Sequence, residues 1–475
     1  MGHLVLLISL VWAFVVTIQY TQVLILRQKL PPGLFPLPVV GNCIRICGQR
    51  PWVACEQWTR EYNSPMITLW RGTSPVIIIN DVWTARDICE SHADVFATRH
   101  VDSPPVKHTT VRYRSFQGNQ AKILTMSLLT DMSDSTTAFE RYADCVVSIF
   151  RSVGSAARDN DQTSKQTDQM GDIIHCGDFA EHSTFVKWLA HVVTSSMWGL
   201  FPMRSPNEGK ARLDAPRIHP DGPDTEQEQI GAHYTGSTYI DGAHLNGSRK
   251  LTNALLSAVS ALCLFSDAQR VAQDEIDSVV GNSRSPSWED FDGSRLPYVS
   301  ALAKEILRWQ PVVTLACAPP SVRDAVFQGF LIPKGTQIAC NIWAIHRNSR
   351  EFPFADVLRP NRFLGTKQAG HESHYPKGVE YNAFGWGLQR CGGQALAEQS
   401  LCSVLARLLW ALNIEPGLKN WNQGGQLSAF RYDGTTPQRR SVPFKVRFTP
   451  RSRRIEDLIE FEAQEAAAQL RRYKM

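Results

Sequence analysis

The chain has 475 residues, a formal net charge of +5 and 43% hydrophobic residues. These values are ordinary for globular proteins and exclude a collagen-like, a wholly disordered or a multi-span membrane protein. The positive excess is too small for this length to indicate binding to nucleic acid. Length alone favours about three domains.

The first predicted element is an apolar helix from Leu4 to Leu26, a run without any charged residue. It exceeds the roughly 20 residues that a helix needs to cross a bilayer. A cleaved signal peptide is the alternative, but no basic segment precedes the run and no small-residue cleavage site follows it. Arg27 and Lys29 come next, so the positive-inside rule leaves the rest of the chain in the cytosol. We therefore predict a membrane anchor over residues 1–29, followed by a stiff, proline-rich spacer.

Two apolar, β-branched runs, residues 66–70 and 75–79, predict a β-hairpin that turns at residues 71–74. Asp81 comes two residues after the second run and is placed to cap a helix that continues to about Glu90. This part of the chain therefore predicts a small sheet with a helix behind it.

The middle of the chain, residues 103–250, is polar and carries weak patterns. It predicts helices only near 137–150 and 181–200. The helical pattern is stronger again over 251–280 and 297–309.

A strand pair is predicted at residues 330–333 and 336–340, with a turn at residues 334–335. A long helix is predicted after Gly393. Its apolar residues recur at helical spacing: Leu401, Val404, Leu405, Leu408, Leu409 and Leu412. The segment from Arg451 onward predicts a charged, solvated helix. The expected fold class is therefore mainly α with small β-sheets.

The eleven cysteines are an odd number without paired Cys-x-x-Cys spacing, which argues against a disulfide framework or a zinc finger. We expect a reducing environment in which most thiols pack as small apolar groups.

Cys391 differs from the other cysteines, because it stands between glycines in residues 384–397, FGWGLQRCGGQALA, just before a predicted helix. A thiolate at a helix N-terminus is stabilised by the helix dipole, and glycines let a flat ligand approach the backbone. Both features favour a thiolate that ligates haem iron over one more buried cysteine.

This segment resembles the haem-binding signature of the cytochrome P-450 superfamily. Glu305 and Arg308 in KEILRW resemble the family's Glu-x-x-Arg pair, and Arg362 in PNRF resembles the Arg of its Pro-x-Arg-Phe segment. In the family these three side chains form a buried triad that stabilises the cysteine loop. Taken alone, such a pair would be a surface salt bridge worth under about 1 kcal/mol. The anchor and first strands resemble microsomal members, and the C-terminal third resembles fungal members of secondary metabolism.

The resemblance implies the cytochrome P-450 fold behind a single transmembrane helix, with residues 30–475 as one catalytic domain. It implies haem b, with Cys391 as the axial ligand of the iron. The other residues implied at the cofactor are Phe384, Gly385, Gly387, Gly393, Gln389 and Arg390. Those implied to line the substrate pocket are Val312, Val313 and Leu315.

The resemblance also implies a function, a monooxygenase that oxidises a small lipophilic substrate such as a polyketide or terpenoid intermediate. Electrons would come from NADPH through a separate reductase. The expected place is the endoplasmic reticulum membrane, with the catalytic domain in the cytosol. We expect a monomer that binds no nucleic acid.

Residues 103–250 depart from the family pattern. The family's acid–alcohol pair on the long central helix aligns with Arg249 and Lys250, or in a second register with His244 and Leu245, so no catalytic side chain is assigned. A Trp-x-x-x-Arg helix is missing around residues 110–130. Gln389 stands where the family has an Arg that pairs with a haem propionate, and Gln carries no charge.

Three alternatives follow from these departures. The protein is a haem-thiolate isomerase or dehydratase that needs no reductase, or it is a catalytically impaired haem-binding protein. The third is that the gene or its model is damaged between residues 103 and 250.

Overall fold

The computed structural model describes residues 2–46, 50–96, 139, 236–287, 289–290, 295–318, 320–364, 381–387, 390–391, 393–417 and 446–472. The helices predicted near 137–150 and 181–200 lie outside these residues, apart from the buried Phe139. The helices and helical turns are α1 Gly2–Arg27, α2 Cys43–Ile46, α3 Pro51–Tyr62, α4 Val82–Arg86, η1 Asp87–Ser91, α5 Ala93–Phe96, α11 Gly236–Leu264, α12 Ser266–Val279, α14 Pro297–Trp309, α15 Ile342–Ile345, η3 Pro360–Phe363, α17 Gln394–Ala411 and α18 Arg453–Arg472. The strands are β1 Met66–Arg71, β2 Ser74–Ile79, β3 Leu315–Cys317, β4 Ala325–Phe327, β5 Phe330–Ile332, β6 Gln337–Asn341, β7 Leu412–Pro416 and β8 Val446–Pro450.

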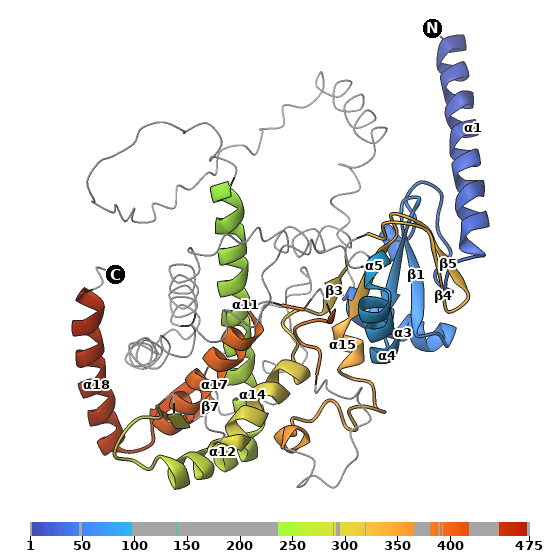
Figure 1. The fold of residues 1–475 in the computed structure, drawn as a ribbon. Helices are drawn as coiled ribbons and strands as arrows, with labels where there is room; N and C mark the ends of the chain where they lie inside the picture. The colour runs from blue at the N-terminus through green and yellow to red at the C-terminus, as the bar shows by residue number, and fades with distance from the viewer. Residues whose placement is uncertain are drawn as a thin grey trace, which may run out of the picture.

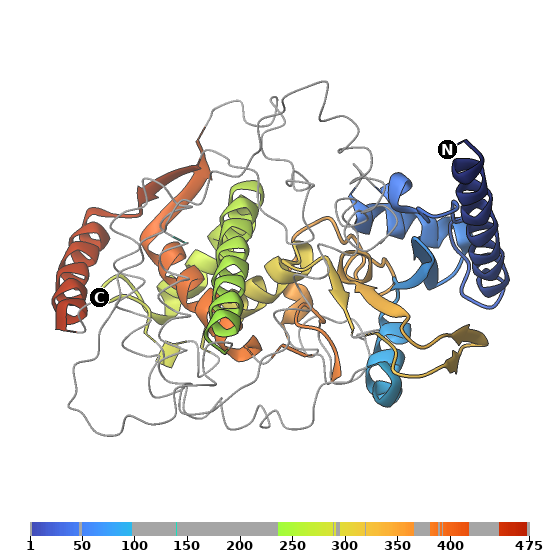
Figure 2. The same ribbon diagram turned by 90° about the horizontal axis from the view of Figure 1, so that it is seen from above.

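The described elements gather in two halves, which both views show side by side (Figures 1 and 2). The sheet half holds α1, α3, α4, α5 and the strands β1 to β6, and the helical half holds α11, α12, α14, α17 and α18. The helical half has one cluster of buried apolar side chains and the sheet half has two. Phe363 on η3 packs against the helical cluster and against one of the two sheet clusters. Phe363 therefore links the two cores.

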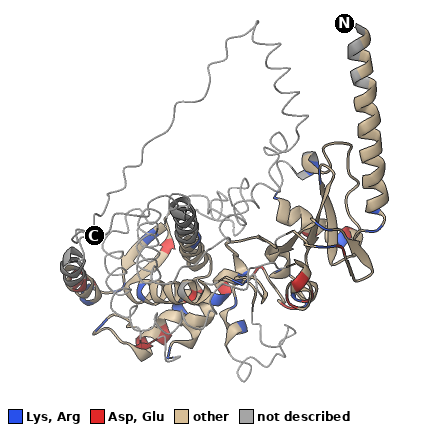
Figure 3. Cartoon of the chain, turned by 45° about the horizontal axis from the view of Figure 1, so that its top comes forward, with Lys and Arg blue, Asp and Glu red and all other residues tan. Residues whose placement is uncertain are grey.

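The N-terminal helix α1 confirms the predicted apolar helix and projects away from the sheet half (Figure 1). It carries no Asp, Glu, Lys or Arg before Arg27, and the described part of its ribbon above that residue is tan in Figure 3. Its segment Leu10–Arg27 is apolar enough to cross a membrane, and 6% of that segment is buried. Val23, near its end, packs in the core of the sheet half. The helix is thus a candidate span that packs against the body near its C-terminal end.

The predicted hairpin is confirmed, since β1 and β2 are antiparallel and Arg71 pairs with Ser74. The turn is tighter than predicted, and Gly72 in it has a φ of +61°, which glycine adopts without strain. The next predicted feature is also present, because the Asp81 carboxylate accepts the N–H of Thr84 at 2.8 Å and caps α4. The helix then continues to Ser91 as the π-helical turn η1.

The predicted pairing of residues 330–333 with 336–340 is wrong. Both segments contain a strand, but β5 pairs with β4, whereas β6 lies between β2 and β3 in a four-stranded sheet of order β1-β2-β6-β3. The turn before β6 is real, because Thr336 N–H donates to the Pro333 carbonyl at 3.1 Å. Both edges of β6 are taken by other strands, so the chain leaves one sheet and enters another at this turn.

The helical stretch predicted over 251–280 is two helices, α11 and α12, which meet at an angle of 104°. Phe265 separates them with a non-helical backbone, and its ring lies edge-on to Trp309 at 5.4 Å. The helix predicted over 297–309 is confirmed as α14. The carboxylate of Glu275 on α12 accepts the backbone N–H groups of Tyr298 and Val299, which joins α12 to the start of α14.

The long helix after Gly393 is confirmed as α17, and its apolar side chains fill the core of the helical half. Leu412 belongs to β7 instead, because the chain becomes extended there. The charged C-terminal helix is confirmed as α18, but it is not wholly solvated. Ile455 and Ile459 on one side of α18 are buried in the helical core.

Candidate functional site

Cys391 lies three residues before the start of α17 and two residues before its N-cap, Gly393. Among the cysteines of the described residues, it is the exposed one. Burial instead raises the pKa of four other thiols to about 12, which keeps them protonated: Cys55, Cys263, Cys317 and Cys402. Position and exposure therefore single out Cys391 as the cysteine available to a ligand.

Backbone hydrogen bonds close the loop that presents Cys391. The Cys391 N–H donates to the Phe384 carbonyl at 2.8 Å, and the Gly385 N–H donates to the Asn382 carbonyl at 3.2 Å. Gly385 and Gly387 have φ angles of +86° and +47°, in the left-handed region that favours glycine. Two of the sequence's loop glycines thus permit the fold of the loop itself.

The loop is held between the two cores. Trp386 is buried in the cluster of the sheet half, while Phe384 packs against the cluster of the helical half. At Gly387 the loop approaches η1 so closely that an added Cβ would lie 2.8 Å from the Cys89 carbonyl oxygen. The sulfur of Cys391 is therefore placed by packing on both sides of its loop.

A single thiolate suits a metal group that brings its own remaining ligands. In the described residues, no group of three or more His, Cys, Asp and Glu side chains is placed to hold a metal ion. Haem iron takes four nitrogens from the porphyrin and needs only an axial ligand such as Cys from the protein. A Cβ added at Gly393 would lie 3.8 Å from the Cys391 sulfur, so a side chain at this position would touch the sulfur, whereas glycine does not. The residues present fit a haem held by Cys391.

The structure brings together Glu305, Arg308 and Arg362. Arg308 donates from Nε and Nη2 to the two carboxylate oxygens of Glu305, each at 2.8 Å. Arg362, on η3, donates from Nε to Glu305 Oε1 at 3.3 Å. The Glu305 and Arg308 side chains are fully buried, so this is not a surface pair.

The remaining donors of this cluster also have partners. Arg308 donates to the backbone carbonyls of His346 and Ala355 at 2.9 and 2.8 Å, and the Arg359 N–H donates to Glu305 at 2.8 Å. Burial, the larger effect, lowers the pKa of Arg362 although Glu305 opposes it. A buried ion pair is tolerated when its hydrogen bonds are satisfied in this way. The cluster therefore fixes α14 to the segment of residues 346–362.

Aromatic rings connect this cluster to the cysteine loop. Phe363 follows Arg362 directly, and its ring lies edge-on to Tyr381 at 5.5 Å between centroids. Tyr381 in turn lies edge-on to Phe384 at 6.3 Å. A chain of contacts thus runs from the Arg362 backbone to the residue whose carbonyl binds Cys391.

The other predicted site residues differ in their burial and in their distance along the chain from Cys391. Arg390 is exposed and donates from Nε to Gln394 Oε1 at 2.7 Å, on the first turn of α17. Gln389 lies outside the described residues. Val312 and Val313 are half-buried, and Val312 packs against the helical core. Leu315 has no exposed surface and packs in a core cluster of the sheet half, and its place in the substrate pocket stays a prediction.

Both registers for the acid–alcohol pair fall on α11. His244, Leu245, Arg249 and Lys250 are all within its helical residues, and the side chains of the first three lie outside the described part. The half-buried Lys250 is followed by the buried Thr252 and Asn253. The helix itself is therefore present where the sequence placed it.

Sequence reasoning missed two groups near these residues. Tyr381 and Glu398 share a hydrogen bond of 2.5 Å beside the cysteine loop. The only sequence signal for this pair was the spacing of Gln394 and Glu398, which lie one helical turn apart behind Cys391.

His346 was also missed, and it is fully buried next to Arg308 and Arg347. Burial and these two positive charges lower its pKa to about 3.

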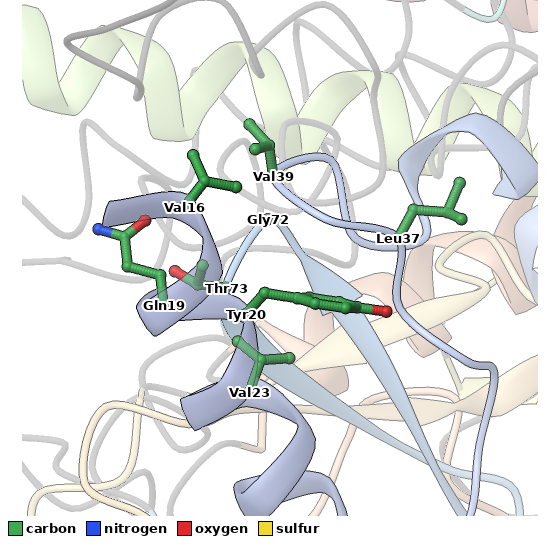
Figure 4. A pocket seen from close by; sticks show the side chains of 8 residues that line it. All are labelled: Val16, Gln19, Tyr20, Val23, Leu37, Val39, Gly72 and Thr73. Carbon is green, nitrogen blue, oxygen red and sulfur yellow. The ribbon is translucent and has the colours of Figure 1, made fainter. Parts of the chain in front are cut away.

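A cleft lies beside the second half of α1 (Figure 4), and Cys391 is not among the residues that line it. It is lined by α1, the proline spacer and the β1–β2 turn: Val16, Gln19, Tyr20, Val23, Leu37, Val39, Gly72 and Thr73. Tyr20 donates a hydrogen bond to the Pro36 carbonyl at 3.1 Å. The cleft marks the junction between helix and body.

Comparison with known proteins agrees with this geometry. The family model described as cytochrome P-450 matches residues 247–425, which include Cys391 and all three residues of the buried cluster. The echilunin cytochrome P-450 monooxygenase of Aspergillus ruber is 26% identical over 465 residues, covering 86% of this chain and 84% of the relative. A cytochrome P-450 monooxygenase of Armillaria gallica is 28% identical, covering 92% of this chain and 93% of the relative. The cytochrome P-450 monooxygenase yanC of Aspergillus niger is 35% identical over 196 residues, covering 40% of this chain and 36% of the relative.

Proposed function

Because this chain belongs to the cytochrome P-450 superfamily, we propose that Cys391 is the axial ligand of a haem b with which the protein oxidises a small lipophilic substrate. The family is one of haem-containing monooxygenases, and the similar fungal proteins carry that name. The observation that carries the proposal is the exposed Cys391 at the start of α17, in a loop closed by its bond to Phe384.

Each group of residues has a separate task in this function. Bound haem supplies the iron chemistry that activates oxygen. Cys391 holds the iron, and the Phe384 carbonyl orients the Cys391 backbone. The buried cluster of Glu305, Arg308 and Arg362 keeps η3, and with it Phe363, against the loop. Gly385 and Gly387 permit the backbone shape that this arrangement needs.

The substrate class is proposed as a polyketide or terpenoid intermediate of secondary metabolism. Val312 and Val313 follow α14 and would offer an apolar surface to such a molecule. The proposed electron source is NADPH through a separate reductase. α1 supports anchoring in the endoplasmic reticulum membrane, with residues 30–475 as a single cytosolic catalytic domain. Phe363, which packs in both cores, supports that single domain.

The test of the ligand is the absorption spectrum of the full-length protein, reduced with dithionite under carbon monoxide. We expect the red-shifted Soret band that a thiolate ligand produces, and we expect Cys391→Ala to abolish it. Cys402→Ala is the matched control, since Cys402 lies on the same helix but its thiol is protonated. A wild-type spectrum without the red-shifted band contradicts the assignment.

A second candidate is a haem-thiolate isomerase or dehydratase that works without a reductase. It is favoured by the sequence of α11, where neither register contains the acid–alcohol pair. This candidate predicts turnover of a peroxide substrate without NADPH. Hydroxylation that depends on both NADPH and reductase would exclude it as the main activity.

A further inference from the structure

Tyr381 and Glu398 are positioning residues: we propose that they clasp the cysteine loop onto α17 and so hold Cys391 in place for its ligand. The role as a haem ligand rests on the proposed function, but the clasp itself is a property of the protein chain.

Three hydrogen bonds make the clasp. Tyr381 donates from Oη to Glu398 Oε1 at 2.5 Å, and Gln394 donates from Nε2 to the same oxygen at 2.9 Å. Arg390 donates from Nε to Gln394 Oε1 at 2.7 Å. Gln394 and Glu398 are one turn apart and therefore lie on the same face of α17.

The clasp binds both ends of the loop. Tyr381 is at its beginning, and Arg390 is the residue directly before Cys391. Both ends are tied to the first two turns of α17, the helix whose N-terminus faces Cys391. A loop fixed at both ends to one rigid helix has fewer conformations available than one fixed at a single end.

Tyr381 also contacts Phe384, the residue whose carbonyl accepts the Cys391 N–H. Its side chain is 8% exposed, and its ring lies edge-on to Phe384. The Phe384 carbonyl accepts the Cys391 N–H at 2.8 Å. A hydrogen bond to a carboxylate is stronger than one between neutral groups, so Glu398 fixes the orientation of the Tyr381 ring.

Packing of the ring alone is the competing explanation, and two substitutions separate it from the clasp. Tyr381→Phe keeps the ring and removes only the hydroxyl that binds Glu398. Glu398→Ala removes the shared acceptor, whereas Glu398→Gln keeps an acceptor oxygen and serves as the rescue. The matched controls are Tyr298→Phe, in the same core, and Glu415→Ala, whose carboxylate makes an exposed ion pair with Arg447.

Two readouts on the full-length, haem-loaded protein test the clasp. The first is the ratio of ferrous–carbonyl protein with the red-shifted, thiolate-type band to protein without it. The second is the hydrogen-exchange rate of the Cys391 amide, followed by mass spectrometry of the peptide that contains it. The second readout is repeated on haem-free protein.

We expect Tyr381→Phe to lower the band ratio and to accelerate amide exchange about fivefold, the effect of one net hydrogen bond. We expect Glu398→Ala to accelerate amide exchange about tenfold, because the lost acceptor is a charged carboxylate. Glu398→Gln should recover about half of both losses, because its acceptor oxygen carries no charge and forms a weaker hydrogen bond, and the two controls should change neither.

Unchanged exchange and an unchanged band ratio in both Tyr381→Phe and Glu398→Ala would overturn the clasp. Equal changes in Tyr298→Phe would also overturn it, because the effect would then be general to the core. If wild type lacks the thiolate band, the proposed function fails, and amide exchange in haem-free protein still decides the clasp. Tyr381→Phe is nearly isosteric, so the test does not depend on whether Glu398→Ala folds.

Discussion

Gly387 is the residue at which the cysteine loop meets η1. We expect Gly387→Ala to be destabilising for two reasons. A left-handed backbone costs alanine about 1–2 kcal/mol, and the new Cβ would lie 2.8 Å from the Cys89 carbonyl oxygen. Urea unfolding should show a loss in unfolding free energy above about 2 kcal/mol, together with lower haem content. Gly335→Ala is the control, since Gly335 also has a positive φ but has nothing near its Cβ position. A loss no larger than that of Gly335→Ala would contradict the close contact.

Glu305 is the shared acceptor of the buried cluster. Glu305→Gln removes the negative charge and leaves the buried guanidinium of Arg308 without an ionic partner. We expect a loss of about 3 kcal/mol in unfolding free energy, because an uncompensated buried charge is costly. Glu415→Gln, which breaks an exposed pair with Arg447, should cost under about 1 kcal/mol. Similar losses in the two variants would show that the cluster behaves as a surface pair.

His346 makes stability depend on pH. Its pKa is about 3 in the folded protein, mainly through burial, against about 6.5 when unfolded. Because the unfolded state binds the proton more tightly, the contribution of His346 to stability decreases as pH falls below about 6.5. Between pH 7 and pH 5, wild type should lose about 2 kcal/mol more than His346→Leu, a variant of similar volume that cannot titrate. Equal losses, measured by urea unfolding at both pH values, would contradict a neutral buried His346.

At the scale of elements, α1 is the helix whose role depends on its surroundings. Phe14 and Ile18 are exposed on it, and 6% of its apolar segment is buried by the body. We expect the double change Phe14→Lys and Ile18→Lys to move the protein from the carbonate-resistant membrane fraction to the soluble fraction. A lysine at the centre of a spanning helix costs about 2.5–3.5 kcal/mol. Phe461→Lys, on the exposed side of α18, should leave the distribution unchanged. Retention of the double variant in the membrane would argue against a span.

The pairing of the strands β5 and β6 is the element-level feature that was predicted wrongly from local sequence. The segments of β5 and β6 are close in sequence and separated by a turn, which is the usual pattern of a hairpin. The partners of β6 come from residues 74–79 and 315–317 instead. Non-local partners decide which sheet a strand joins, and a window of ten residues does not contain them.

At the scale of the whole molecule, haem and fold should be linked. A ligand that binds only the folded state stabilises it by about 2.7 kcal/mol at a hundredfold excess over its dissociation constant. We expect haem-loaded wild type to unfold at higher urea concentration than haem-loaded Cys391→Ala. The haem-free forms of the two proteins should unfold together, because Cys391 is exposed and contributes little packing. A large difference between the haem-free forms would show that Cys391 has a structural role of its own.

Some residues at the site were predicted from local sequence patterns, and others were found only in the tertiary structure. Cys391, the loop glycines and the spacing of Glu305 and Arg308 are local patterns, and helices and tight loops are set by neighbours in sequence. Tyr381 and His346 carry no such pattern, and Glu398 carries only its spacing of one helical turn from Gln394. Their positions follow from contacts that α17, η3 and α15 make only in the folded chain.

Length and composition indicated about three domains, and the motifs indicated one body behind an apolar helix. The sequence by itself determined the apolar α1, the helices α14 and α17, the first hairpin and the cysteine loop, because each depends on residues close along the chain. Only the tertiary structure decided that Glu305 and Arg308 are buried with Arg362, that β6 lies between β2 and β3, and that the loop is held between two cores. These features join segments far apart in sequence, and burial in a shared core is what brings such segments together.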